Sequence, residues 1–219
     1  MKTRNNEIGV DEYYHLFNRG VEKQIIFLDD RDYARFLFLI IYFQSPVNFY
    51  NLTRPITSFV RRRTFNINEE KVVKVIKTRI VKLNAFCLMP NHFHLLIQEV
   101  EDNGIAKYMH RILTAYAKYF NTKYHHNGHV FQGAYKFKHI LNNDQFLYLS
   151  AYIHKNPKAY GDYPWSSYLS YNKKNSWPEL LVIDDIGGQF QTTKEYAEWV
   201  KNSSAKEIAE ELREILGEC

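Results

Sequence analysis

The chain has 219 residues, 45% hydrophobic and 16% aromatic, which is enough for one well-packed domain with appendages. Its two cysteines, Cys87 and Cys219, exclude a disulfide framework and a four-thiolate zinc site. No stretch reaches the ~18 apolar residues of a transmembrane helix, and the polar start lacks the apolar core of a secretory signal, so we expect a cytoplasmic protein without a membrane partner.

Charge is unevenly distributed along the chain, whose net charge is +5. From Ser176 onward there are four Lys/Arg and ten Asp/Glu; of the chain's 29 basic and 24 acidic residues, this leaves 25 and 14 for the rest. A basic body with an acidic tail is typical of a protein whose body binds a polyanion such as nucleic acid. A soluble basic domain without such a partner is the alternative.

The first predicted elements are a strand and a helix. Residues 12–20, EYYHLFNRG, are mostly aromatic and apolar and end in Asn-Arg-Gly, which indicates a strand closed by a turn. The stretch DDRDYARFLFLIIYFQ then has apolar residues at helical spacing, and Asp29 or Asp30 can cap it. Residues 45–80 have no clear period, and we interpret them as an insertion that is a long, basic loop.

The middle of the chain predicts two more strands, at 81–89 and 92–100, with a tight turn at Pro90-Asn91. An amphipathic helix follows at 104–125, and then a fourth strand at 129–141, whose register around Gly133 the pattern leaves open. A helix starting at Asn143 or Asp144 is stopped by Pro157.

This order of elements predicts an α+β fold. It is the ferredoxin-like split βαβ pattern, with an antiparallel sheet and helices on one face. We assign residues 1–170 to this domain, with the insertion inside it, and 171–219 to an acidic, mostly helical extension. The extension ends in two short predicted helices within 192–217.

A pair of histidines marks the third strand. Residues i and i+2 of a strand point to the same face, so His92 and His94 project together with Cβ atoms about 7 Å apart. That suits two ligands of one divalent ion, although two surface histidines without a metal are the alternative. The carboxylates nearby do not complete a site, because Glu99 alternates away and Asp102 lies past the strand.

The last helix of the domain offers a third ligand. Tyr152 and Asn156 are spaced i, i+4 and therefore share one helix face. An Asn carbonyl oxygen is a hard ligand that suits Mg²⁺ or Mn²⁺. Asn156 precedes Pro157 and so sits at the helix end, where its side chain can turn inward. For Tyr152 alone, ordinary packing is the alternative.

Five segments resemble one family in order and spacing: YHLFNRG, AFCLMPNHFHLLIQ, YAKYFNTKY with GHVFQGAYKFKHI, YLSAYIHKNPKAYG and YPWSSY. The chain is identified by them as similar to the single-tyrosine HUH transposases, in particular the REP-associated tyrosine transposases of bacteria. The resemblance implies a ferredoxin-like, usually homodimeric, nucleoid-associated enzyme that cleaves and rejoins single-stranded DNA next to hairpins. It implies that His92, His94 and Asn156 hold Mg²⁺ or Mn²⁺ and that Tyr152 is the nucleophile.

The implied chemistry agrees with the residue types. Attack by Tyr152 on a DNA phosphate gives a 5′-phosphotyrosine and conserves the energy of the broken bond, so rejoining needs no ATP. Lys155 lies close enough in sequence to assist or to bind DNA. Further candidate DNA-binding residues, for each of which a solvated cation is the alternative, are Arg19, Arg61, Arg62, Arg63, Arg111, Lys136 and Lys138.

Three other functions stay open at this point. A domesticated module could bind a hairpin without cutting it. A zinc or manganese hydrolase could use activated water and would survive loss of Tyr152. A rolling-circle replication initiator would share the histidine pair but commonly needs further domains.

Overall fold

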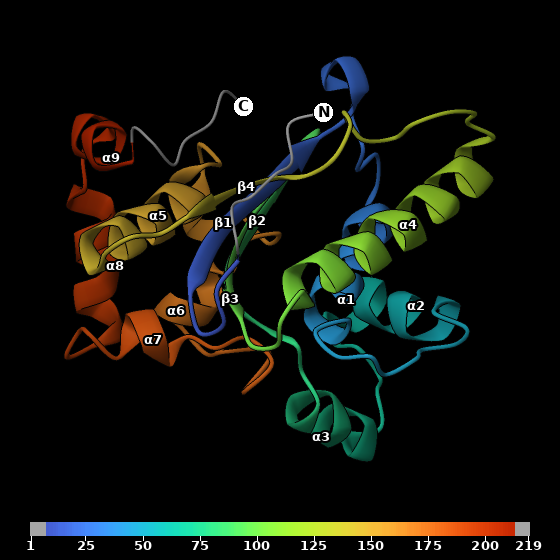
Figure 1. The fold of residues 1–219 in the computed structure, drawn as a ribbon, viewed down its shortest axis with the longest axis horizontal. Coiled ribbons are helices and arrows are strands. Elements are labelled where there is room, and N and C mark those ends of the chain that lie inside the picture. Colours follow the sequence, from blue (N-terminus) through green and yellow to red (C-terminus); the bar gives the residue numbers. More distant parts are fainter. Residues whose placement is uncertain (1–7, 213–219) are drawn as a thin grey trace.

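A four-stranded antiparallel sheet forms the middle layer of the molecule (Figure 1). The computed structural model describes residues 8–212. The sheet order is β2-β3-β1-β4, and the strands are β1 (Tyr13–Arg19), β2 (Val81–Met89), β3 (His92–Glu99) and β4 (Lys136–His139). This is the order of the split βαβ pattern, so the predicted fold class is confirmed.

One face of the sheet is covered by α1 (Asp30–Tyr42) and α4 (Gly104–Tyr124), on the right of Figure 1. Alternate residues of β3, namely Phe93, Leu95 and Ile97, belong to this core. The buried Glu99 carboxylate accepts hydrogen bonds from the first backbone N–H groups of α4, at 2.9 and 2.7 Å. It therefore joins the end of β3 to the start of α4 and is not part of the histidine face.

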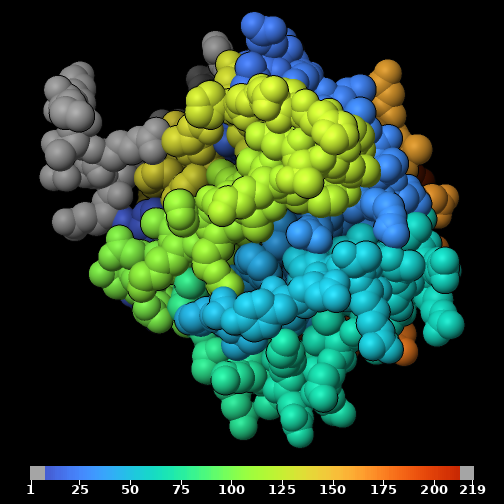
Figure 2. All heavy atoms as spheres, turned by 90° about the vertical axis from the view of Figure 1, so that its right-hand side faces the viewer, coloured from blue at the N-terminus to red at the C-terminus, as the bar shows by residue number. Residues whose placement is uncertain are grey.

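The insertion is folded, which corrects the expectation of a loop. It contains α2 (Thr53–Arg62) and α3 (Glu69–Lys77), and α3 is capped by Asn68. The insertion covers α1: the Phe38 ring lies 5.3 Å from Phe49 and 5.2 Å from Phe65, centroid to centroid. Figure 2 shows the insertion, in cyan to teal, as the part of this face below α4. A helical segment that is apolar all round, as residues 36–42 of α1 are, needs such a cover.

The other face of the sheet, where helices were not expected, is covered as well. Its layer begins with α5 (Asn143–Lys155), which the Asn142 side chain caps. Buried residues of this second core include Cys87 and Leu96 from the sheet and Ile153 from α5. The rest of the layer is α6 (Tyr168–Asn172), which crosses the predicted boundary at residue 170, and three helices of the extension, α7 (Asp184–Gly187), α8 (Thr193–Asn202) and α9 (Ala205–Glu211).

Two predicted boundaries differ from the structure. The fourth strand, expected over 129–141, pairs with β1 only at Lys136–His139, because Gly133 has a φ of +70° and interrupts the extended chain. Helices α8 and α9 lie where two short helices were predicted, but residues 213–217 of that prediction fall outside the described residues. Within 8–212, no helix is both long and apolar enough to cross a membrane.

Candidate metal and nucleophile site

The histidine pair lies at the start of β3, on the sheet face that α5 covers. Strand pairing places His92 opposite Arg19 and His94 opposite Phe17 on β1. The two imidazole rings are 5.1 Å apart, centroid to centroid. His94 is completely buried and His92 only partly, so one ring of the pair is reachable from the surface.

Helix α5 brings the other two candidate residues to this pair. Asn156 Oδ1 lies 3.2 Å from His92 Nε2, and the Tyr152 ring lies 5.3 Å from the His94 ring. Asn156 directly follows the last helical residue, where Pro157 ends the helix. All four side chains lie close together within the chain.

The hydrogen bonds of His92 leave a lone pair pointing into the site. Its Nδ1 is 2.7 Å from Asn91 Oδ1, an acceptor, so Nδ1 carries the proton. Burial lowers the pKa of His92, and Arg19 lowers it further, while Asn156 opposes the shift. Neutral His92 therefore presents the Nε2 lone pair to Asn156 Oδ1, a second acceptor.

His94 adds a third unsatisfied atom. Its Nδ1 is 2.9 Å from His15 Nε2, and its Nε2 is buried without a hydrogen-bond partner in the described part of the chain. Burial, then His15 and His92, lower the pKa of His94 well below the ordinary value, so this imidazole is neutral. A buried polar atom without a partner is costly unless something binds it.

These atoms fit a divalent cation. Two imidazole nitrogens and an amide oxygen belong to neighbouring side chains, and each can offer a lone pair rather than a proton. Among the described residues no cluster of three or more His, Cys, Asp or Glu could hold a metal, and the amide of Asn156 is the candidate third ligand beside the two histidines. This leaves the set without a protein carboxylate.

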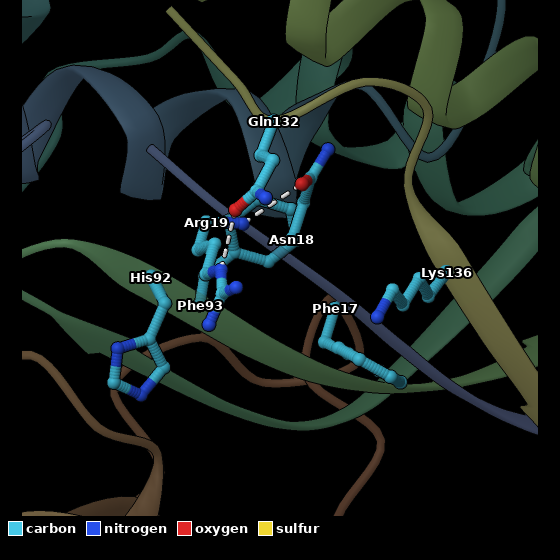
Figure 3. Close-up of a pocket in the computed structure, with 7 residues that line it drawn as sticks. All are labelled: Phe17, Asn18, Arg19, His92, Phe93, Gln132 and Lys136. Atoms are coloured by element: carbon cyan, nitrogen blue, oxygen red, sulfur yellow. Dashed lines mark hydrogen bonds between the residues drawn. The ribbon is translucent and has the colours of Figure 1, made fainter. Parts of the chain in front are cut away.

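A pocket of about 120 Å³ opens beside His92 (Figure 3). Phe17, Asn18 and Arg19 from β1, together with Gln132 and Lys136, line it with His92. The Arg19 guanidinium donates to Gln132 Oε1 at 2.6 Å. The pocket therefore combines two cations with an aromatic wall next to the candidate ligands.

The predicted cations of β4 lie on the histidine face. Residues directly opposite one another in antiparallel strands share a face. Lys138 is opposite His15, and Lys136 is opposite Phe17, which is itself opposite His94. Both lysines are exposed, so they border the site from the edge strand.

The three arginines of the insertion lie at the end of α2. Arg61 and Arg62 occupy its last turn, and Arg63 caps it; all three are exposed. The Arg63 guanidinium lies 5.0 Å above the Trp165 ring and pairs with Asp30 at 3.2 Å. The Trp165 carbonyl accepts a hydrogen bond from the Leu88 N–H of β2. Arg63 and Trp165 therefore lie beside the end of β2 that leads to His92.

Two other predicted DNA-binding residues have internal partners. The Arg111 guanidinium donates to the carbonyls of Phe43, Ser45 and Val47, and thus anchors the first residues of the insertion. Lys155 Nζ donates to the carbonyls of Lys201 and Ser203 at the end of α8. Arg111 and Lys155 therefore hold backbone segments in place, and neither side chain points toward the histidine pair.

Sequence reasoning missed two residues of the site. His15 of β1 contacts His94, and Asn91 orients His92. Asn91 has a local signal, because it directly precedes His92. His15 has none beyond its strand alternation, which puts it on the same face as Phe17.

A buried histidine of α5, His154, joins this helix to the chain that packs on the side away from the sheet. His154 Nδ1 is 2.7 Å from the Tyr196 hydroxyl of α8, and Nε2 is 2.8 Å from Ser167 Oγ. Burial lowers the pKa of His154 to about 3 from the ordinary 6.5. Since the unfolded chain takes up this proton at higher pH than the folded chain, the stability linked to His154 is present above pH 6.5 and is lost toward pH 3.

Replacing this histidine makes folding less sensitive to acid. Between pH 7 and pH 5 we expect wild type to lose about 2 kcal/mol of unfolding free energy through His154, at ~1.4 kcal/mol per pH unit below 6.5. His154→Gln removes this part of the loss, although it is less stable at pH 7. Urea unfolding at both pH values measures the difference, and equal losses in the two proteins would contradict the assignment.

Two comparisons with known proteins found a match. Residues 54–156 match the family model described as IS200-like transposase, a range that contains both histidines, Tyr152 and Asn156. A solved structure of a REP-associated tyrosine transposase bound to a REP hairpin is similar, with a TM-score of 0.51 and 16% identity. The alignment covers 82% of this chain and 90% of that one, and at this identity it shows the fold. A search of curated proteins finds no match.

Proposed function

We propose that the protein cleaves and rejoins single-stranded DNA next to hairpins, on the basis of the match of residues 54–156 to the IS200-like transposase family model. The observation that carries the proposal is the meeting of Tyr152 with His92, His94 and Asn156. A nucleophile beside three convergent lone pairs is an arrangement for phosphoryl transfer. The hairpin target is supported by the solved relative, whose printed description names a REP hairpin.

The reaction we propose exchanges one phosphodiester for another. The Tyr152 oxygen attacks the phosphorus, the bond to the 3′ oxygen breaks, and that oxygen leaves as a hydroxyl. The DNA 5′ end remains on the chain as phosphotyrosine. Attack by a 3′-hydroxyl on this ester reverses the exchange and releases Tyr152. The expected homodimer stays a prediction.

His92, His94 and Asn156 would hold Mg²⁺ or Mn²⁺. Such an ion, when bound, neutralises charge on a phosphate oxygen and so favours attack. The protein itself keeps both imidazoles neutral by burial, so that their lone pairs are available at neutral pH. Asn91 fixes the ring of His92 through its Nδ1–H.

The DNA path we propose runs across the cations around His92. Arg19 and Lys136 line the pocket beside it, and Lys138 follows on β4. Arg61, Arg62 and Arg63 lie beyond the end of β2, where they can contact the phosphates of a hairpin stem. The pocket would take a nucleotide close to the cleaved bond.

Removing two arginines of the insertion tests this path. For the double variant Arg61→Gln/Arg62→Gln we expect weaker hairpin binding and a salt slope (log Kd against log salt) that is smaller by up to about 2, since each phosphate contact contributes about 0.9. Fluorescence anisotropy over a salt series measures it. The control Lys194→Gln/Lys206→Gln changes net charge equally on exposed residues of α8 and α9 and should keep the wild-type slope. If instead the control lowered the salt slope and the arginine variant kept it, the DNA would contact the extension rather than the end of α2.

The proposed function is tested by trapping the covalent product. The full chain is incubated with labelled hairpin oligonucleotides that carry single-stranded flanks, with Mg²⁺ or Mn²⁺. We expect a protein–DNA adduct, with the DNA on Tyr152 by peptide mass spectrometry. Hairpin binding without an adduct, unaffected by a chelator, would instead support a binding module, and turnover without an adduct would support hydrolysis by water.

A further inference from the structure

His15 connects the two halves of the site. It is completely buried on β1, and its Nε2 lies 2.9 Å from His94 Nδ1. Its ring stacks on Phe17 at 4.7 Å, lies nearly coplanar with the His94 ring at 5.1 Å, and meets the Tyr152 ring edge-on at 6.2 Å. One side chain therefore touches both a candidate metal ligand and the candidate nucleophile.

The short contact between the two imidazoles restricts their protons. One of the two facing nitrogens must donate and the other accept. If His15 donated, the proton of neutral His94 would be on Nε2, which is buried and has no partner in the described part of the chain. A buried N–H without an acceptor is costly. If His94 Nδ1 donates to His15, the Nε2 of His94 becomes a lone pair facing the site.

We propose that His15 is a positioning residue that accepts the Nδ1 proton of His94 and so holds its Nε2 as the free ligand atom. Histidines that ligate metals commonly donate their other ring N–H to such a partner, which fixes both tautomer and orientation. The stacking of the His15 ring on Phe17 fixes the orientation of His15 itself. His15 acts through His94 and is not itself a ligand.

The inference rests on the proposed metal site but makes a separate claim about this chain. Direct binding of Mn²⁺ is the readout, without DNA or cleavage. We expect His15→Phe, which keeps an aromatic ring but accepts no hydrogen bond, to weaken Mn²⁺ binding by about 10- to 100-fold. His15→Gln, whose amide oxygen can accept the proton, should recover most of the affinity. Isothermal titration of the three full-length proteins gives the values.

Two spectroscopic measurements separate positioning from mere packing. Imidazole ¹⁵N shifts of the metal-free wild type should show His94 with its proton on Nδ1. Pulsed EPR of the Mn²⁺ complex should show two coordinated imidazoles. The control Tyr13→Phe lies on the same strand, loses a hydrogen bond to Asp185 and should bind Mn²⁺ like wild type.

Several results would overturn the inference. They are a folded His15→Phe protein with wild-type affinity, a His94 proton on Nε2, or three coordinated imidazoles. The wild-type tautomer tests the proposal even if the variants fail to fold. Binding of Mn²⁺ that depends on His15 but yields no DNA adduct would refute the proposed function and leave this inference standing.

Discussion

Tyr152→Phe is expected to abolish the covalent protein–DNA adduct and to lower cleavage by on the order of 10⁴-fold or more, as loss of a nucleophile does elsewhere. The physical reason is that the substitution removes the proposed attacking oxygen, which the register of α5 sets beside His94. The variant keeps the ring, so the edge-on contacts with His15 and His94 survive, and the melting temperature should change little. Denaturing gels of labelled oligonucleotide measure the adduct.

Tyr148→Phe is the matched control for this experiment. Tyr148 lies one helical turn earlier on α5, with its ring 5.5 Å from Trp199 of the extension. Its hydroxyl is removed by the same substitution, yet we expect a normal adduct. An adduct of wild-type amount in Tyr152→Phe, or its loss in Tyr148→Phe alone, would assign the nucleophile elsewhere.

His92→Ala is expected to cost about 100-fold or more in Mn²⁺ affinity and to remove the adduct at ordinary metal concentration, because one of three ligand atoms is lost. His92 is a better choice than His94 for this test, because His94 is completely buried. Truncating His94 would leave a cavity and would remove its hydrogen bond with His15. Calorimetric titration and the gel assay check the two effects together.

His139→Ala controls for the loss of an imidazole from the same sheet. His139 is exposed on β4 and is within 2.6 Å of Glu12, away from the ligands. We expect unchanged Mn²⁺ affinity and a normal adduct. If His92→Ala bound Mn²⁺ as tightly as wild type, the proposed ligand set would be wrong.

Local signals were enough to predict the sheet and its histidines. The alternation of apolar residues and the Pro90-Asn91 turn placed β2 and β3 within one residue of their observed bounds. The i, i+4 spacing put Tyr152 and Asn156 on one face of α5, but only the family resemblance joined that face to His92. No sequence spacing states which helix face meets which sheet face.

What could not be predicted depends on partners distant in the chain. Whether a cation meets solvent or a backbone carbonyl is decided by packing, so Arg111 and Lys155 could not be distinguished from Arg19. The contact between His15 and His94 joins strands 79 residues apart. The helices of the insertion did carry a signal, since Asn68 followed by two glutamates is a helix start.

The aromatic contacts between α1 and the insertion have a consequence for comparing chains across the family. Phe38 and Tyr42 point away from the sheet and pack on Phe49 and Phe65. In a relative that lacks the insertion these two positions would face water, where large rings are unfavourable. The residue types at the two positions should therefore change together with the presence of the insertion. That correlation would reveal the inserted helices in sequences too divergent to align between α1 and β2.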